Sequence, residues 1–179
     1  MATLHRPHAL PQETASRLLR RMLQVITYFG EICVGPFLAI FLFASSSRPI
    51  GNAAALTATG VIAWTLAEYF GHRFVLHRLA PTEHRLHHAH PGEPVLSISW
   101  QIWACFGLLY LIVDGAFLTG LLVAYAWYLF VHHCTHHSAD RLPAFLVRYH
   151  NGHHKFVTRN YGVTTSLWDH AFGTVLRDN

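Results

Sequence analysis

Four long runs of apolar residues divide the chain, and histidine-rich polar segments follow the second and the fourth. The runs cover roughly residues 22–44, 53–70, 95–113 and 115–131. Each approaches the ~20 residues that an α-helix needs to cross the hydrocarbon core of a bilayer. A backbone in lipid must satisfy its own hydrogen bonds, which a helix does. The pattern therefore predicts four transmembrane helices, with Gly35-Pro36 kinking the first and Asp114-Gly115 forming a tight turn between the last two.

The composition supports an integral membrane protein with a single all-α domain over residues 1–179. Hydrophobic residues make up 52% of the chain and charged residues 12%, whereas soluble domains carry about 25% charged residues. A soluble four-helix bundle is not favoured, because the chain has too few polar residues to cover the outside of such a bundle. The net charge of +4 is modest and forms no basic stripe with aromatic residues, so nucleic-acid binding is not predicted. Three irregularly spaced cysteines do not predict a disulfide framework.

The basic residues predict the orientation in the membrane. Of the 13 Lys and Arg residues, only Arg48 falls between the first and second runs, and the other 12 lie on the opposite side. The positive-inside rule assigns that side to the cytosol. We therefore expect both termini, the N-terminal segment 1–21 and the histidine segments 72–90 and 132–174 to be cytosolic, in a bacterial inner membrane or the endoplasmic reticulum.

The chain contains 16 histidines, and most of them gather in four clusters on the predicted cytosolic side. Residues three or four apart share one face of a helix, so members of one cluster can converge. His72 and His77 are five apart, which suits ligands of two different metals or a helix end that unwinds. The four clusters are His72 and His77; His84, His87 and His88; His132, His133, His136 and His137; and His150, His153 and His154.

So many imidazoles predict a two-metal site, since one ion accepts roughly four to six ligands. All-nitrogen ligation suits zinc, iron, copper or nickel and disfavours magnesium and calcium. The clusters begin where helices leave the membrane, which favours chemistry on a lipid over a structural zinc site. A histidine-rich metal buffer would not require helical spacing split between two segments.

At these residues the chain resembles the fatty acid hydroxylase / sterol desaturase superfamily of membrane di-iron enzymes. The resemblance covers about residues 68–174: Glu68-Tyr69 through His77, the boxes that follow it, and a closing signature with Asn160-Tyr161-Gly162 and Trp168-Asp169. The resemblance implies four membrane helices and a cytosolic cap of short helices carrying a dimetal site. The implied metal ligands are His72, His77, His84, His87, His88, His132, His136, His150, His153 and His154. His133 and His137 offer an alternative register of the third box.

The resemblance also implies O2-dependent hydroxylation of an unactivated C–H bond in a fatty acyl or sphingolipid chain. Two iron ions would be the cofactor and O2 the co-substrate, although purified protein can carry zinc instead. Each turnover needs two further electrons, so we expect a separate cytochrome b5-like or ferredoxin-like donor. A carotenoid ring hydroxylase and a sterol or lipid desaturase are the enzymatic alternatives, and a membrane metal-binding or transport protein is the non-enzymatic one.

Three further residues are candidates for orienting the ligand imidazoles. Glu68 lies one turn before His72, and Asp169 and Tyr161 belong to the closing signature. Metal-bound histidines commonly need such hydrogen-bond partners. Glu31 lies inside the first apolar run. It either pairs with a polar group of another helix or is neutral and structural, and we favour the structural role.

Overall fold

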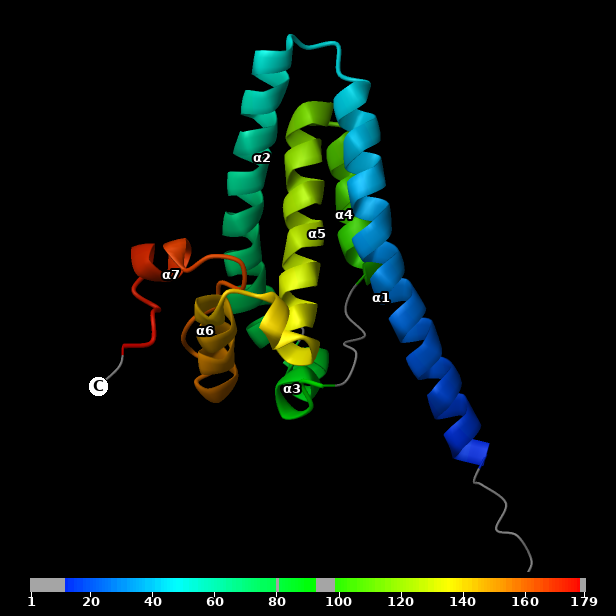
Figure 1. Cartoon of the computed structure of the whole chain (residues 1–179), viewed down its shortest axis with the longest axis vertical. Helices are drawn as coiled ribbons and strands as arrows, with labels where there is room; N and C mark the ends of the chain where they lie inside the picture. The colour runs from blue at the N-terminus through cyan, green and yellow to red at the C-terminus, as the bar shows by residue number, and fades with distance from the viewer. Residues whose placement is uncertain (1–11, 80, 93–98, 178–179) are drawn as a thin grey trace, which may run out of the picture.

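The computed structural model describes residues 12–79, 81–92 and 99–177, and this part of the chain contains helices and turns but no strand. Helix α2 continues directly into a π-helix, η1, and a short 3-10 helix, η2, follows α5 (Figure 1). The elements are α1 (Gln12–Ala44), α2 (Ile50–Phe70), η1 (Gly71–Leu79), α3 (Pro81–Ala89), α4 (Ser99–Tyr110), α5 (Gly115–His137), η2 (Ala139–Arg141), α6 (Ala144–Lys155) and α7 (Leu167–Ala171).

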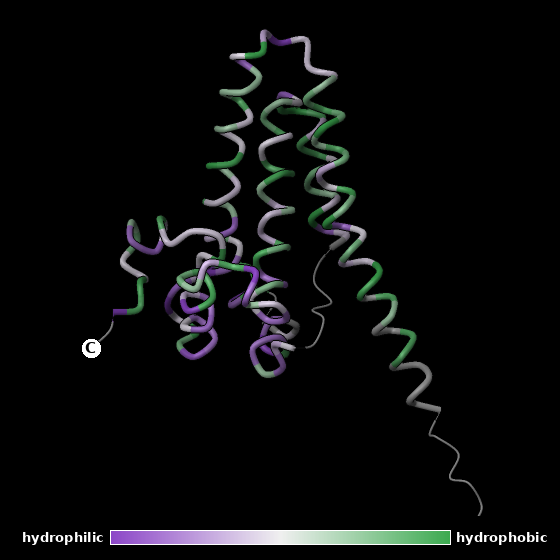
Figure 2. The backbone as a smooth tube through the Cα atoms, in the orientation of Figure 1, coloured by the Kyte–Doolittle hydropathy of each residue, from purple (hydrophilic) through white to green (hydrophobic). Residues whose placement is uncertain are grey.

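Within these residues, three helices are long and apolar enough to cross a membrane. They are Val25–Ala44, Ile50–Leu79 and Gly115–His137. Large apolar side chains such as Phe37 and Ile40 on α1 are exposed, as expected of surfaces that face lipid. Apolar residues dominate the long helices, whereas polar residues gather at the end that carries the short helices (Figure 2). The chain is therefore a membrane protein.

Helix α5 lies between α1 and α2 and provides most of the buried core (Figure 1). Gly60 and Gly120 bring α2 and α5 into backbone contact, because a Cβ atom on Gly120 would lie 2.0 Å from the carbonyl oxygen of Thr57. Small residues allow this close approach in membrane helices. On the other side of the core, Phe106 of α4 packs against Tyr125 of α5. These contacts hold α2 and α5 together along their apolar parts, and the histidines follow toward the C-terminal ends of both helices.

Several helix boundaries differ from those that the apolar runs predict. The first helix begins at Gln12, not near residue 22, and remains helical through Pro36. The last long helix ends at His137, not at 131, so the third histidine cluster lies on its final two turns. The hydropathy pattern underestimates the length of both helices, because the polar residues at their ends continue the same helical hydrogen bonding.

The predicted span over residues 95–113 is not confirmed. Its described helix, α4, has 12 residues and is about 18 Å long at 1.5 Å per residue, while the hydrocarbon core is about 30 Å thick. Residues 93–98 lie outside the described part of the chain. The short turn before Gly115 does place α4 beside α5, as the Asp114-Gly115 pair predicts, and the Asp114 side chain caps α5 by accepting a hydrogen bond from the backbone of Ala116.

Of the two alternatives for Glu31, the structure shows the polar partner on another helix that the first one requires. The Glu31 carboxylate is buried and accepts a hydrogen bond of 2.9 Å from the Tyr125 hydroxyl. Glu31 therefore ties α1 to α5 inside the membrane-spanning part.

Candidate metal centre

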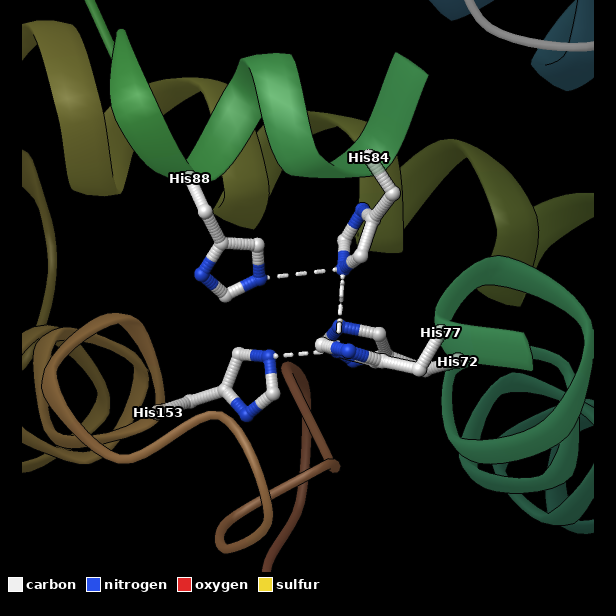
Figure 3. A group of neighbouring side chains, drawn as sticks. All are labelled: His72, His77, His84, His88 and His153. Atoms are coloured by element: carbon white, nitrogen blue, oxygen red, sulfur yellow. Dashed lines mark hydrogen bonds between the residues drawn. The ribbon is translucent and has the colours of Figure 1, made fainter. Parts of the chain in front are cut away.

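Ten imidazoles meet at the polar end of the long helices and form two groups of five. Within each group, one nitrogen from each ring lies within 4.8 Å of the others. Figure 3 shows the first group, to which η1, α3 and α6 each contribute. The first group is His72, His77, His84, His88 and His153, and the second group is His87, His132, His136, His150 and His154.

Hydrogen bonding cannot account for the packing of the first group. The Nε2 atom of His84 lies 2.8 Å from Nε2 of His72 and 3.1 Å from Nε2 of both His77 and His88. One ring nitrogen carries either one hydrogen or one lone pair, so it can satisfy only one of these three neighbours. Several ring nitrogens gathered around one point could instead hold a cation at that point.

The separations between the nitrogens fit a transition metal. Metal–imidazole bonds of about 2.0–2.1 Å place neighbouring nitrogens about 2.9–3.4 Å apart for right-angled to tetrahedral geometry. In the second group, Nε2 of His132 lies 2.9 Å from that of His87, and the Nε2 atoms of His150 and His154 are 3.1 Å apart. Nε2 of His136 is buried without a hydrogen-bond partner in the described chain. Both groups thus have the donor type and spacing of a metal site.

The π-helix explains how His72 and His77 reach the same group. In a straight α-helix, residues five apart point in different directions, but the i→i+5 pattern of a π-helix places them on successive turns. η1 covers Gly71–Leu79 and so includes both histidines. Of the two alternatives that the spacing leaves open, the geometry favours the distorted helix end, because both histidines lie on the π-helix and belong to one group.

Adjacent histidines on α3 and α6 connect the two groups. His87 and His88 are neighbours in sequence but belong to different groups, and the same holds for His153 and His154. Helices α3 and α6 face each other across the site, since the His88 and His154 rings stack with centroids 4.3 Å apart. Each helix therefore contributes to both groups.

Backbone carbonyls hold two imidazoles of the first group by their other nitrogen. Nδ1 of His72 donates to the carbonyl oxygen of Tyr161 at 2.6 Å, and Nδ1 of His153 donates to that of Arg159 at 2.7 Å. With Nδ1 protonated, the Nε2 lone pair points toward the centre of the group. Such contacts fix the tautomer and the orientation of metal-binding histidines.

The loop that supplies the Tyr161 carbonyl is held by two buried carboxylates. Asp169, which is fully buried, accepts hydrogen bonds from the backbone N–H of Tyr161 and Gly162 and from the Thr174 hydroxyl. Glu68 accepts from residues 163 and 164 of the same loop. The structure thus places both carboxylates behind the loop, not against an imidazole. Asp169 holds the N–H of Tyr161, whose carbonyl oxygen contacts His72.

Sequence reasoning assigned no role to two residues of this loop. Arg159 acts through its carbonyl, which no sequence pattern reveals. Asn160 adopts a left-handed conformation with φ 53°, and its side chain bonds the carbonyl of Tyr149 and the N–H of Leu176. Asn tolerates this conformation better than most residues, and this preference was the available signal.

The structure places His133 and His137 outside both groups. Their rings stack on each other with centroids 4.6 Å apart, and His133 also packs against Phe29 of α1. His132 and His136, one turn apart on α5, face the second group instead. The geometry therefore favours His132 and His136 as the ligands from this cluster.

Burial keeps the grouped imidazoles neutral. Loss of hydration, reinforced by neighbouring histidines, lowers the pKa of His84 and His154 from 6.5 to about 2 and that of His87 to about 3. Burial also lowers the pKa of His153 to about 3 and holds that of His150 well below 6.5. Metal binding requires this neutral form.

These shifts predict that the metal-free protein loses stability in acid. Because the folded pKa values lie below 6.5, the unfolded chain binds more protons as the pH falls below that value. Stability should be roughly constant above about pH 7 and should fall steeply between about pH 6.5 and pH 3. Thermal unfolding of the metal-free protein in detergent measures this, and an unfolding midpoint independent of pH across that window would contradict it.

A cavity of about 340 Å³ joins both groups to the membrane-spanning helices. Four imidazoles line one end, two from each group: His72, His84, His87 and His132. The walls are mainly apolar and are formed by side chains of α2, η1, α4 and α5. These side chains include Trp64, Leu76, Ile102, Tyr128 and Leu129. A second cavity of about 230 Å³ reaches His132 and His136 between α1 and α5.

Membrane-spanning helices with two groups of five imidazoles at one end define a membrane protein with a candidate binuclear metal centre. The chain belongs to the fatty acid hydroxylase family, whose family model matches residues 57–174. The match includes all ten grouped histidines and the loop with Asp169.

Similar proteins support this assignment. The chain is 35% identical over 142 residues to a dihydroceramide fatty acyl 2-hydroxylase of Arabidopsis thaliana, covering 67% of this chain and 60% of that protein. It is 35% identical over 147 residues to a ceramide very long chain fatty acid hydroxylase of Saccharomyces cerevisiae, covering 68% and 38%. The solved structure of full-length scs7p, with only the hydroxylase domain visible, matches with a TM-score of 0.64 and 27% identity over 86% of this chain and 66% of that chain. This chain thus spans about 60% or less of these two curated relatives.

Proposed function

We propose that this protein is an O2-dependent hydroxylase that inserts oxygen into an unactivated C–H bond of a fatty acyl or sphingolipid chain. The observation that carries the proposal is the apolar cavity that ends on imidazoles of both groups. Apolar walls with a few polar groups at one end are typical of small-molecule sites. A flexible hydrocarbon chain fits such walls.

The ten grouped imidazoles fit two metal ions and are proposed to hold two iron ions. Iron bound there would supply the redox chemistry that activates O2. The protein's own residues would bind the hydrocarbon against the metal-facing end of the cavity and keep water away from it. The carbonyls of Tyr161 and Arg159 would keep the Nε2 lone pairs of His72 and His153 directed inward.

We also propose that the site faces the cytosol. Arg48 lies in the α1–α2 loop, at the end of the long helices opposite the histidines (Figure 1). The positive-inside rule supports this orientation. A separate donor protein of the cytochrome b5 or ferredoxin class would then supply electrons from the cytosolic side.

The alternatives have less support. The relatives reported above are named for hydroxylation of fatty acyl chains, which favours an acyl chain over a carotenoid ring or desaturation. A metal transporter needs ligands along a path through the membrane, whereas the grouped histidines meet at one end of the long helices.

Expression in a host that lacks fatty acyl hydroxylation, under ¹⁸O2, tests the function together with the role of the cavity. Wild-type protein should yield lipids with one labelled oxygen in an acyl chain. Ile102→Trp should reduce the product about tenfold or more, because the larger side chain fills the cavity without contacting the metal groups.

Leu108→Trp is the matched control, since Leu108 lies on the same helix and is 65% exposed. Labelled product from wild type and Leu108→Trp, with little from Ile102→Trp, supports the proposal. The absence of labelled acyl product from wild-type protein that carries its metals would overturn it, and equal yields from all three proteins would overturn the assignment of the cavity.

A further inference from the structure

The larger and the smaller cavity meet at Tyr28 of α1. Of the described side chains that line these cavities, three line both of them: Tyr28, His87 and His132. His87 and His132 belong to the second group of imidazoles, so a metal ion bound there would hold their rings in place. Tyr28 belongs to neither group. The Tyr28 side chain is therefore the wall between the two cavities that is not itself a candidate metal ligand.

Tyr28 is held against α5 by two contacts. Its hydroxyl donates a hydrogen bond to the carbonyl oxygen of Leu129, and its ring packs against His133 with centroids 5.5 Å apart. Leu129 lines the larger cavity, whereas His133 lines the smaller one. Leu129 precedes His132 by three residues, or about one turn of α5. The Tyr28 side chain thus crosses from α1 to α5 at the metal-facing end of the larger cavity.

Apolar side chains also line the smaller cavity, among them Val25, Phe29 and Pro91. A hydrocarbon gains free energy when it leaves water for such a surface. The smaller cavity would therefore accept part of an acyl chain if it were open to the larger one. Because Tyr28 stands between them, a molecule bound in the larger cavity must end at Tyr28, and the carbon beside the metal groups lies close to that end.

We propose that Tyr28 is a specificity-determining residue, which sets the carbon that is oxidised by ending the larger cavity beside the metal groups. The inference rests on the proposed hydroxylation. Tyr28 lies on α1, outside residues 57–174 that the family model matches. A different side chain at this position would thus change the position of oxidation without any change in a metal ligand.

The position of the ¹⁸O label in the acyl product tests this role. A ratio of positional isomers does not depend on how much protein folds. Tyr28→Ala should join the two cavities and raise the share of shifted isomers about tenfold. Tyr28→Phe keeps the ring and should give the wild-type isomer.

Phe29→Ala is the matched control, because it removes a neighbouring aromatic ring that lines the smaller cavity but not the larger one. It should also give the wild-type isomer. Unchanged isomers from Tyr28→Ala, or an equal shift in Tyr28→Phe or Phe29→Ala, would overturn the inference.

Photolabelling of the purified protein without reductant tests the same wall without turnover. The probes are palmitic acid analogues that carry a diazirine near the carboxyl or the methyl end, and mass spectrometry locates the label. In wild type and Phe29→Ala, label should reach Ile102 of the larger cavity but not Pro91, which lines only the smaller one. In Tyr28→Ala, it should reach both residues.

This labelling pattern would support the role of Tyr28 even if wild-type protein forms no hydroxylated lipid, a result that counts against the proposed function alone. Label at Pro91 in wild type, or at Pro91 in none of the proteins, would overturn the inference, because Tyr28 would then not separate the two cavities.

Discussion

Replacing His150 and His153 with alanine in one chain should reduce lipid hydroxylation by more than about a hundredfold. The two side chains are 1% and 0% exposed, and each belongs to a different group. The double variant therefore removes one nitrogen from each proposed metal. Product formation per chain, measured on purified protein with a chemical reductant, gives the result.

His133→Ala with His137→Ala is the control for this prediction. It also removes two imidazoles, from the same end of the protein, but these lie outside both groups. The control should keep its turnover within about twofold of wild type. Comparable losses in the two double variants would contradict the ligand assignment and restore the alternative register of the third cluster.

Asp169→Asn should reduce turnover about 10- to 100-fold, although the substitution hardly changes the side-chain volume. One carboxylate oxygen accepts from the N–H of Gly162 at 2.8 Å, and the other accepts from that of Tyr161 at 2.8 Å. An amide nitrogen at either position would oppose an N–H donor and leave a buried group without a partner, at a cost of about 1–3 kcal/mol. The loop would shift, and the Tyr161 carbonyl would no longer orient His72.

The measurement must separate positioning from folding. The pH profile of turnover and the metal content of Asp169→Asn are compared with those of Glu68→Gln, whose amide can still accept from residues 163 and 164. Glu68→Gln should retain most of the activity. Full activity of Asp169→Asn, or an equal loss in Glu68→Gln, would show that the backbone contacts of Asp169 do not position His72.

The membrane-spanning helices were predictable because length and apolar composition are local properties of the chain. Their ends were not, because polar residues such as His136 and His137 continue α5 without any break in helical hydrogen bonding. The span predicted over 95–113 is not confirmed, since its described helix is only 12 residues long. Hydropathy measures affinity for lipid and does not locate helix ends.

Convergence of the histidines was predictable from helical spacing, but their division between two groups was not. His84 and His88 share the first group, while His87 belongs to the second. This split depends on how α3 lies against α6, which is a tertiary property. The π-helix at Gly71–Leu79 was also hidden, since nothing in its sequence marks a change from i→i+4 to i→i+5 bonding.

The roles of the orienting residues were only partly predictable. Glu68 and Asp169 were candidates because buried carboxylates near histidines often accept hydrogen bonds from them. In the structure both bind backbone N–H groups of one loop. The contact to His72 comes from a carbonyl, a group that every residue carries, so residue identity cannot reveal it.

The most direct test of the binuclear centre is the metal content per chain of protein purified anaerobically in detergent, measured by elemental analysis. Two groups of five imidazoles predict about two iron ions per chain. The double variant His150→Ala with His153→Ala should lose most of this iron, and the His133→Ala with His137→Ala control should keep it. One metal ion or none in wild-type protein, or a content that the ligand substitutions leave unchanged, would contradict the binuclear site.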